Sequence, residues 1–148
     1  MRDKRFDKAV ARILKQDSRY PARAYDLMPA VIDYTVRHPM PTDSNEPPRP
    51  QGHVSGRQLA FGFRDYLLSE FGPFAADLLD EMNIRSTDDI GNLVYNLISV
   101  GVFGKTQSDA LEDFHAVYDF TEAFRDYYAP RDPKDAPEMP DFLAGDEE

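Results

Sequence analysis

The segment STDDIGNLVYNLISVG, residues 86–101, decides the fold class. Its apolar residues recur at the three- and four-residue spacing that gives an α-helix one buried face; they are Ile90, Leu93, Val94, Leu97 and Ile98. Ser86 or Thr87 can cap the start of this helix, and the two acids that follow complement the positive end of its dipole. Gly101 marks its end. The segment therefore predicts an amphipathic helix packed against a core.

Similar patterns on both sides of this segment predict further helices. Ser55 to Gln58 form an S-x-x-Q capping box, with Val54 as a hydrophobic staple, in front of a central helix. Pro29 lies within the second helical pattern and predicts a kink there, or a start closer to Pro29. The helical patterns outside 86–101 cover residues 6–14, 22–37, 55–71, 74–82 and 119–127.

A short β-ribbon is expected near the end of the helical region. The run His115–Tyr118 can pair as a strand with Val102–Phe103 across a turn at Gly104–Thr106, and residues 108–114 read as one helical turn. Helix, short helix, turn, helix and ribbon over residues 55–118 follow the order of a winged-helix domain. We predict a mainly α fold, a compact helical domain over residues 3–128 with a small two-stranded, winged-helix-like ribbon.

Two segments differ in composition from the helical patterns. Residues 38–52 contain five prolines and predict a long Pro-rich loop. Residues 129–148 contain seven acidic and two basic residues and predict a disordered acidic tail, which carries half of the net charge of −10. Because both the tail and the rest of the chain are acidic, bulk attraction to nucleic-acid phosphates is disfavoured.

Several function classes are disfavoured by what the sequence lacks. There is no cysteine, which excludes disulfides, thiolate metal sites and a cysteine nucleophile. No run of about 18 apolar residues indicates a membrane span, and the N-terminus lacks the apolar stretch of a secretory signal. No phosphate-binding loop or nucleophile motif occurs. We expect a cytoplasmic protein without a cofactor and without membrane association, and an enzyme is the less favoured class.

The polar face of residues 86–99 is the first candidate site. In a DNA-reading winged helix this would be the recognition helix, yet it presents Asp88, Asp89, Asn92 and Asn96 and no Lys or Arg. Carboxylates repel phosphates, so this face favours a protein partner over nucleic acid. We assign partner binding to these four residues and to Tyr118.

The second candidate site is a polar cluster of His53, Asp113, His115 and Asp119. Imidazoles and carboxylates that converge can hold a metal ion or perform acid–base catalysis. No recognised metal-ligand spacing joins them, and local backbone capping explains the same residues. The sequence leaves both interpretations open.

Several motifs occur in a characteristic order along the chain. They are residues 53–59 (HVSGRQL), 71–75 (FGPFA), 86–97, Gly104-Lys105-Thr106, Asp109 with Glu112-Asp113-Phe114, and 118–124 (YDFTEAF). Over about residues 6–124 they resemble a conserved-hypothetical family known mainly from planctomycetes and verrucomicrobia. The sequence departs from that pattern at Pro29, at Ile90 in place of an aromatic residue, and at Asn92 in place of an acid. The family has no established activity, so the resemblance implies no catalytic residue and only draws attention to residues 118–120.

The favoured hypothesis is a non-enzymatic protein-interaction module whose partner is a protein. The alternative is a metal-dependent or acid/base enzyme that uses the His/Asp cluster. A winged-helix-like nucleic-acid binder is the second alternative. The sequence leaves the identity of the partner and the oligomeric state open.

Overall fold

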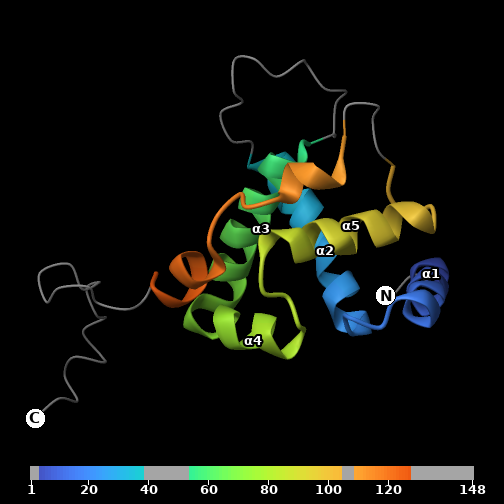
Figure 1. Cartoon of the computed structure of the whole chain (residues 1–148), viewed down its shortest axis with the longest axis horizontal. Coiled ribbons are helices and arrows are strands. Elements are labelled where there is room, and N and C mark those ends of the chain that lie inside the picture. Colours follow the sequence, from blue (N-terminus) through green and yellow to red (C-terminus); the bar gives the residue numbers. More distant parts are fainter. Residues whose placement is uncertain (1–3, 39–53, 105–108, 128–148) are drawn as a thin grey trace, which may run out of the picture.

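The fold is built from helices and single helical turns (Figure 1). A computed structural model describes residues 4–38, 54–104 and 109–127. Its α-helices are α1 (Lys4–Gln16), α2 (Ala22–Arg37), α3 (Gly56–Phe71), α4 (Ala75–Glu81) and α5 (Thr87–Ser99). The single turns are η1 (Gly72–Phe74), η2 (Leu111–Phe114) and η3 (Thr121–Arg125). The prediction of a mainly helical protein is confirmed.

The predicted β-ribbon is not supported, since the described residues contain no strand. The amides of Val102 and Phe103 both donate to the carbonyl oxygen of Leu97 and so close the end of α5. In the other expected strand, Ala116 has a φ of 50°, a left-handed conformation that a strand does not accommodate. The amide of Val117 donates to a side-chain oxygen of α5 instead of to a partner strand. The described residues therefore lack the β-ribbon that would form the wing of a winged-helix domain.

Helix α2 shows how tertiary packing can override a local signal. The helix begins at Ala22, so a start nearer Pro29 is wrong, and Pro29 lies exposed inside it. A proline in a helix interior removes one backbone hydrogen bond and costs about 3 kcal/mol. Tyr25, Met28 and Val31 on the same helix are fully buried, and their burial offsets this cost. The expected last helix is shorter than predicted, a single π-type turn over Thr121–Arg125.

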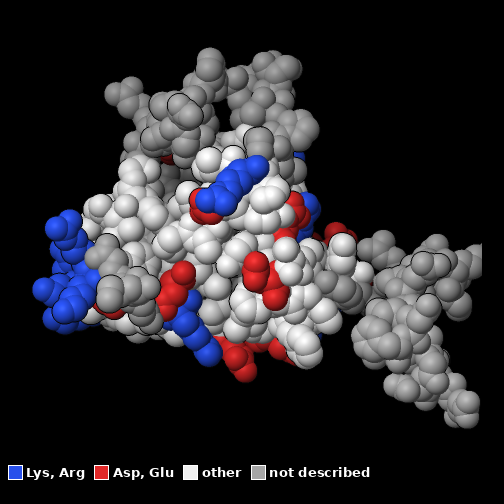
Figure 2. All heavy atoms as spheres, turned by 180° about the vertical axis from the view of Figure 1, so that it is seen from behind, with Lys and Arg blue, Asp and Glu red and all other residues white. Residues whose placement is uncertain are grey.

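Charge is distributed unevenly over the surface. Figure 2 shows Lys and Arg gathered at one edge of the molecule, over α1, which carries five basic residues and one Asp. No helix in the described ranges is both long and apolar enough to cross a membrane. The predictions for the Pro-rich loop and for the acidic tail concern residues that, apart from His38, lie outside the described part of the chain.

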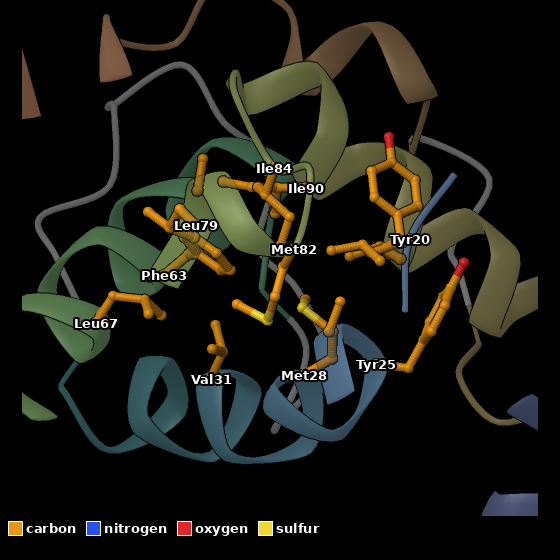
Figure 3. Packing of buried hydrophobic residues seen from close by; sticks show 14 of the residues in the cluster. Tyr20, Tyr25, Met28, Val31, Phe63, Leu67, Leu79, Met82, Ile84 and Ile90 are labelled. Carbon is orange, nitrogen blue, oxygen red and sulfur yellow. The ribbon is translucent and has the colours of Figure 1, made fainter. Parts of the chain in front are cut away.

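The core lies between α2, α3, α4 and α5 (Figure 3). Each of these helices contributes side chains that are no more than 2% exposed, among them Met28, Val31, Phe63, Leu67, Leu79 and Ile90. Ile84, in the link before α5, and Phe124, from η3, are equally buried. The apolar stripe of residues 86–101 therefore packs as predicted, and η3 covers the α4 side of the core.

A glycine sets the close crossing of α2 and α3. A Cβ atom at Gly62 would lie 1.8 Å from Oγ1 of Thr35, which is buried on α2. The Thr35 hydroxyl donates to the carbonyl oxygen of Val31 at 2.8 Å, so it is satisfied within its own helix. This crossing fixes the positions of α2 and α3 relative to each other.

Candidate functional site

An apolar cavity of about 260 Å³ lies between the start of α3 and the second half of α5. We call it the α3–α5 cavity. Its apolar walls come from Ile32 on α2, from α3 and α5, and from the segments that follow α5. Its lining residues are Ile32, Val54, Ser55, Gly56, Leu59, Val94, Tyr95, Ile98, Val102, Phe103, Gly104, Asp109, Ala110, Asp113 and Phe114.

The capping box of α3 fixes one wall of this cavity. The amide of Gln58 donates to the Ser55 hydroxyl at 3.0 Å, and the Ser55 amide donates to the Gln58 side chain at 2.9 Å. Ser55 is buried. Because both partners are satisfied locally, the first turn of α3 is rigid at the point where Val54 and Gly56 meet the cavity.

The opposite wall of the cavity is η2, which packs closely against two glycines. A Cβ atom at Gly91 of α5 would lie 2.9 Å from three atoms of Phe114, and one at Gly56 of α3 would lie 2.9 Å from Cβ of Asp113. Phe114 is only 3% exposed. The absence of side chains at the two glycines lets η2 pack directly on both helices and close the cavity from that side.

The polar part of the lining is acidic. Asp109 and Asp113 line the cavity, and no Lys or Arg does so among the described residues. A carboxylate oxygen of Asp113 accepts the amide of Ala110 at 3.0 Å. Burial raises the pKa of the Tyr95 hydroxyl, and the negative charges of Asp109, Asp113 and Glu112 raise it further. The α3–α5 cavity thus combines apolar walls with two carboxylates.

The predicted partner-binding face of α5 is mostly covered by the chain itself. The Tyr20 hydroxyl donates to Asp89, and the Asn92 amide donates to that same hydroxyl at 3.0 Å. The other Asp89 oxygen accepts the amides of Arg85 at 2.8 Å and Ser86 at 3.1 Å, which caps α5. Burial, followed by the hydrogen bond to Asp89, raises the pKa of Tyr20.

Asn96 extends this arrangement one turn further along α5. Its side-chain amide donates to Asp17 at 2.9 Å and to the Tyr25 hydroxyl at 3.0 Å. The Arg19 guanidinium holds Asp17 from the other side, at 2.7 Å. Together these residues form what we call the α5 polar network: Asp17, Arg19, Tyr20, Tyr25, Asp89, Asn92 and Asn96. It fastens the link between α1 and α2 to α5.

The two remaining members of the predicted face lie elsewhere. Asp88 is exposed and lies 3.2 Å from Nδ1 of His115, which is also exposed. The Tyr118 hydroxyl donates to the carbonyl oxygen of Ala60 at 2.7 Å. Burial raises the pKa of Tyr118, whose ring contacts Phe61 and Phe120. Tyr118 therefore packs against α3.

The predicted His/Asp cluster does not form among its described members. A side-chain oxygen of Asp119 accepts the amide of Glu122 at 3.0 Å and so caps η3, while Asp113 caps η2. His115 pairs with Asp88 rather than with either of them. In the described ranges no three His, Asp or Glu side chains are arranged to hold a metal ion. His53 lies outside the described residues.

The cavity itself was missed at the sequence level, although its parts carried signals. The sequence indicates helix capping for Val54 and Ser55, and Gly91 lies within the predicted helix of residues 86–101 without an evident local reason. A glycine within a helix indicates close packing, and here it marks the seat of Phe114. A void between helices has no periodic pattern in the sequence.

Comparison of the chain with family models, with curated proteins and with solved structures gave no match. The resemblance to the planctomycete and verrucomicrobial family therefore stays a prediction.

Proposed function

We propose that this protein is a non-enzymatic interaction module that binds a segment of another protein by receiving an apolar side chain in the α3–α5 cavity. The cavity supports this proposal because part of its apolar lining is exposed and can be covered by an occupant. Ile98 and Val102 both line it and are only half-buried. An apolar anchor that fills such a pocket contributes the largest share of binding energy at many interfaces.

The size of the cavity favours a side chain over a cofactor. Pockets for small molecules usually measure about 300–1,000 Å³, whereas this one measures about 260 Å³. It has room for one large side chain of a partner. The rigid capping box and the seat of Phe114 mean that little order is lost on binding, which favours affinity.

Selection of random displayed peptides on the full chain tests this proposal. We expect the enriched peptides to share a large apolar residue, and Val102→Trp to weaken their binding roughly thirtyfold by filling the pocket. The matched control is Phe74→Ala, which removes a side chain that is 73% exposed and lies outside the cavity lining. Fluorescence anisotropy gives both affinities, and circular dichroism checks that each variant is folded.

Two outcomes would contradict the proposal. One is that enriched peptides bind the Val102→Trp variant as tightly as the unchanged chain. The other is that Phe74→Ala weakens binding as much as Val102→Trp, which would place the interface around η1 instead.

A further inference from the structure

Helix α1 carries a continuous basic stripe. It contains Lys4, Arg5, Lys8, Arg12 and Lys15, all exposed, and a single acid. At about 100° per residue, these five side chains fall within an arc of about 100° around the helix axis. Figure 2 shows a dense group of basic side chains at the edge of the molecule where α1 lies. The helix has a charge of +4 in a chain of −10, so all other residues together carry −14.

The opposite face of α1 is already in use. Ala9, Val10 and Ile13 are no more than 4% exposed and pack in the interior. A basic amphipathic helix that binds a lipid surface needs its apolar face for insertion, and this face is not accessible. Within the described residues no ion pair involves Lys4, Lys8 or Lys15. The exposed face of α1 can therefore bind a partner through its positive charge.

The charge of the remaining chain restricts the kind of partner. A long polyanion laid against α1 would also meet the acidic body of the protein, and that contact is repulsive. A short acidic peptide can contact the helix alone. At physiological salt, charges more than about 8 Å apart are largely screened, so such a local contact is decided by the groups that face each other.

The chain contains an acidic peptide of suitable spacing. In residues 130–141 an acid occurs at every third position, as Asp132, Asp135, Glu138 and Asp141; the segment also contains prolines and two bases, Arg131 and Lys134, so its net charge is −2. In a polyproline II chain, which has three residues per turn and advances about 9.3 Å per turn, residues at every third position lie on one side. On α1, Lys8 and Lys15 are seven residues apart, a rise of about 10.5 Å. The two charge spacings nearly match.

We propose that the basic stripe of α1 binds the acidic segment 130–141 of a second copy of this chain. The last described residues, beyond η3, lie at the edge of the molecule away from α1 (Figure 1). A contact from the end of one copy to the α1 edge of the next is head-to-tail, and it leaves a free basic stripe and a free acidic segment at the two ends. The α3–α5 cavity takes no part in this contact.

Sedimentation velocity of the full chain over a range of concentrations tests this proposal. At low salt, about 20 mM, the weight-average mass is expected to increase with concentration, and at about 500 mM salt it is expected to fall to that of the monomer. Neutralising the segment with Asp135→Asn, Glu138→Gln and Asp141→Asn should weaken association roughly tenfold. The matched control neutralises three acids outside the repeat, with Asp146→Asn, Glu147→Gln and Glu148→Gln.

A charge-swap experiment identifies the two surfaces. Lys8→Glu with Lys15→Glu should abolish self-association, as should Asp135→Lys with Glu138→Lys in a separate protein. Mixing the two variants should restore association, because the unchanged segment of the first variant meets the unchanged stripe of the second, and the reversed stripe meets the reversed segment. A control with Arg23→Glu and Arg37→Glu changes the same amount of charge on α2.

Three outcomes would overturn the proposal. They are a mass that stays monomeric at every concentration and at low salt, equal effects of the two neutralised triplets, and no restored association in the charge-swap mixture. Compaction of the monomer in place of self-association would assign the segment to the stripe of its own copy and would equally contradict binding to a second copy.

Discussion

The two sides of α5 use their side chains in opposite ways. On one side Asp89, Asn92 and Asn96 are joined by hydrogen bonds to the link between α1 and α2. On the other side Val94 and Ile98 border the α3–α5 cavity, where apolar lining is left uncovered. The polar side looked like the docking face in the sequence, and the structure uses it to hold the fold together. The apolar side looked like ordinary core, and it includes the space that an occupant can fill.

The largest loss of stability is expected when Asp89, on the polar side of α5, is removed. Asp89→Ala deletes the acceptor of the buried Tyr20 hydroxyl and of the amides of Arg85 and Ser86. We expect a loss of about 2–4 kcal/mol in the free energy of unfolding, since a buried donor and a helix cap are both left without partners. Urea denaturation measures it.

The neighbouring acid provides a matched control. Asp88→Ala removes an exposed carboxylate whose partner is the exposed His115, so we expect a change within about 0.5 kcal/mol. Equal losses for the two variants would mean that the α5 polar network contributes no stability beyond that of a surface acid.

The next largest loss of stability is expected at Gly91, where α5 packs against Phe114 of the cavity wall. In Gly91→Ala the new methyl would lie 2.9 Å from three atoms of Phe114, which is buried and must shift. Overpacking of this kind costs about 1–3 kcal/mol and should lower the melting temperature. Gly104→Ala is the control, because a Cβ atom there meets nothing within 4 Å. If both variants melted at the temperature of the unchanged protein, η2 would not be seated on Gly91.

These contrasts show which parts of the structure the sequence could predict. The apolar stripe of residues 86–101 and the capping box at Ser55 follow from local periodicity and hydrogen bonding, and both are present. Periodicity separates polar from apolar faces, but it carries no information about what covers a polar face. Asn96 therefore looked available, although it bonds Asp17 and Tyr25 from segments about 70 residues away in sequence.

Two other differences between the predicted and the observed structure also arise because a local sequence pattern does not describe tertiary packing. The ribbon was expected from short apolar runs, which helix ends and loops also produce, and here Val102 closes α5 by bonding Leu97. The α3–α5 cavity exists because side chains of α2, α3, α5 and the segments that follow α5 leave space between them. Its volume is a property of tertiary packing, so the sequence shows only individual residues that contribute to it, such as Val54 in its lining and Gly91 behind Phe114.

Acid should weaken the polar side of α5 by a smaller amount. The hydrogen bond from Arg19 holds the pKa of Asp17 well below its usual range, against the opposing effect of burial and with help from Asn96. The folded pKa lies below the unfolded value of about 3.9, so the stability from this pair is present above that pH and is lost as pH falls below about 4. Because Arg19 is 55% exposed, we expect about 1 kcal/mol or less.

The pH dependence can be assigned by substitution. Thermal unfolding of Asp17→Asn between about pH 2 and pH 6 should show a shallower loss of stability toward acid than the unchanged protein. Glu70→Gln, which removes an exposed carboxylate on α3, should leave the slope as it is. A slope unaltered by Asp17→Asn would show that acid acts through other carboxylates.

The smallest effect on stability is expected from a substitution at the α3–α5 cavity. It tests whether the apolar side of α5 differs from the filled core. Val102→Trp directs an indole into a space of about 260 Å³, so we expect a change within about 0.5 kcal/mol. The same substitution at Val31, which is fully buried in the core, has no such space and should destabilise the protein by about 1–3 kcal/mol or prevent folding. Urea denaturation compares the two. If Val102→Trp destabilised the protein as much as Val31→Trp, the cavity would be closed to a large side chain. The apolar side of α5 would then be core like the rest, and the binding proposal would lose its site.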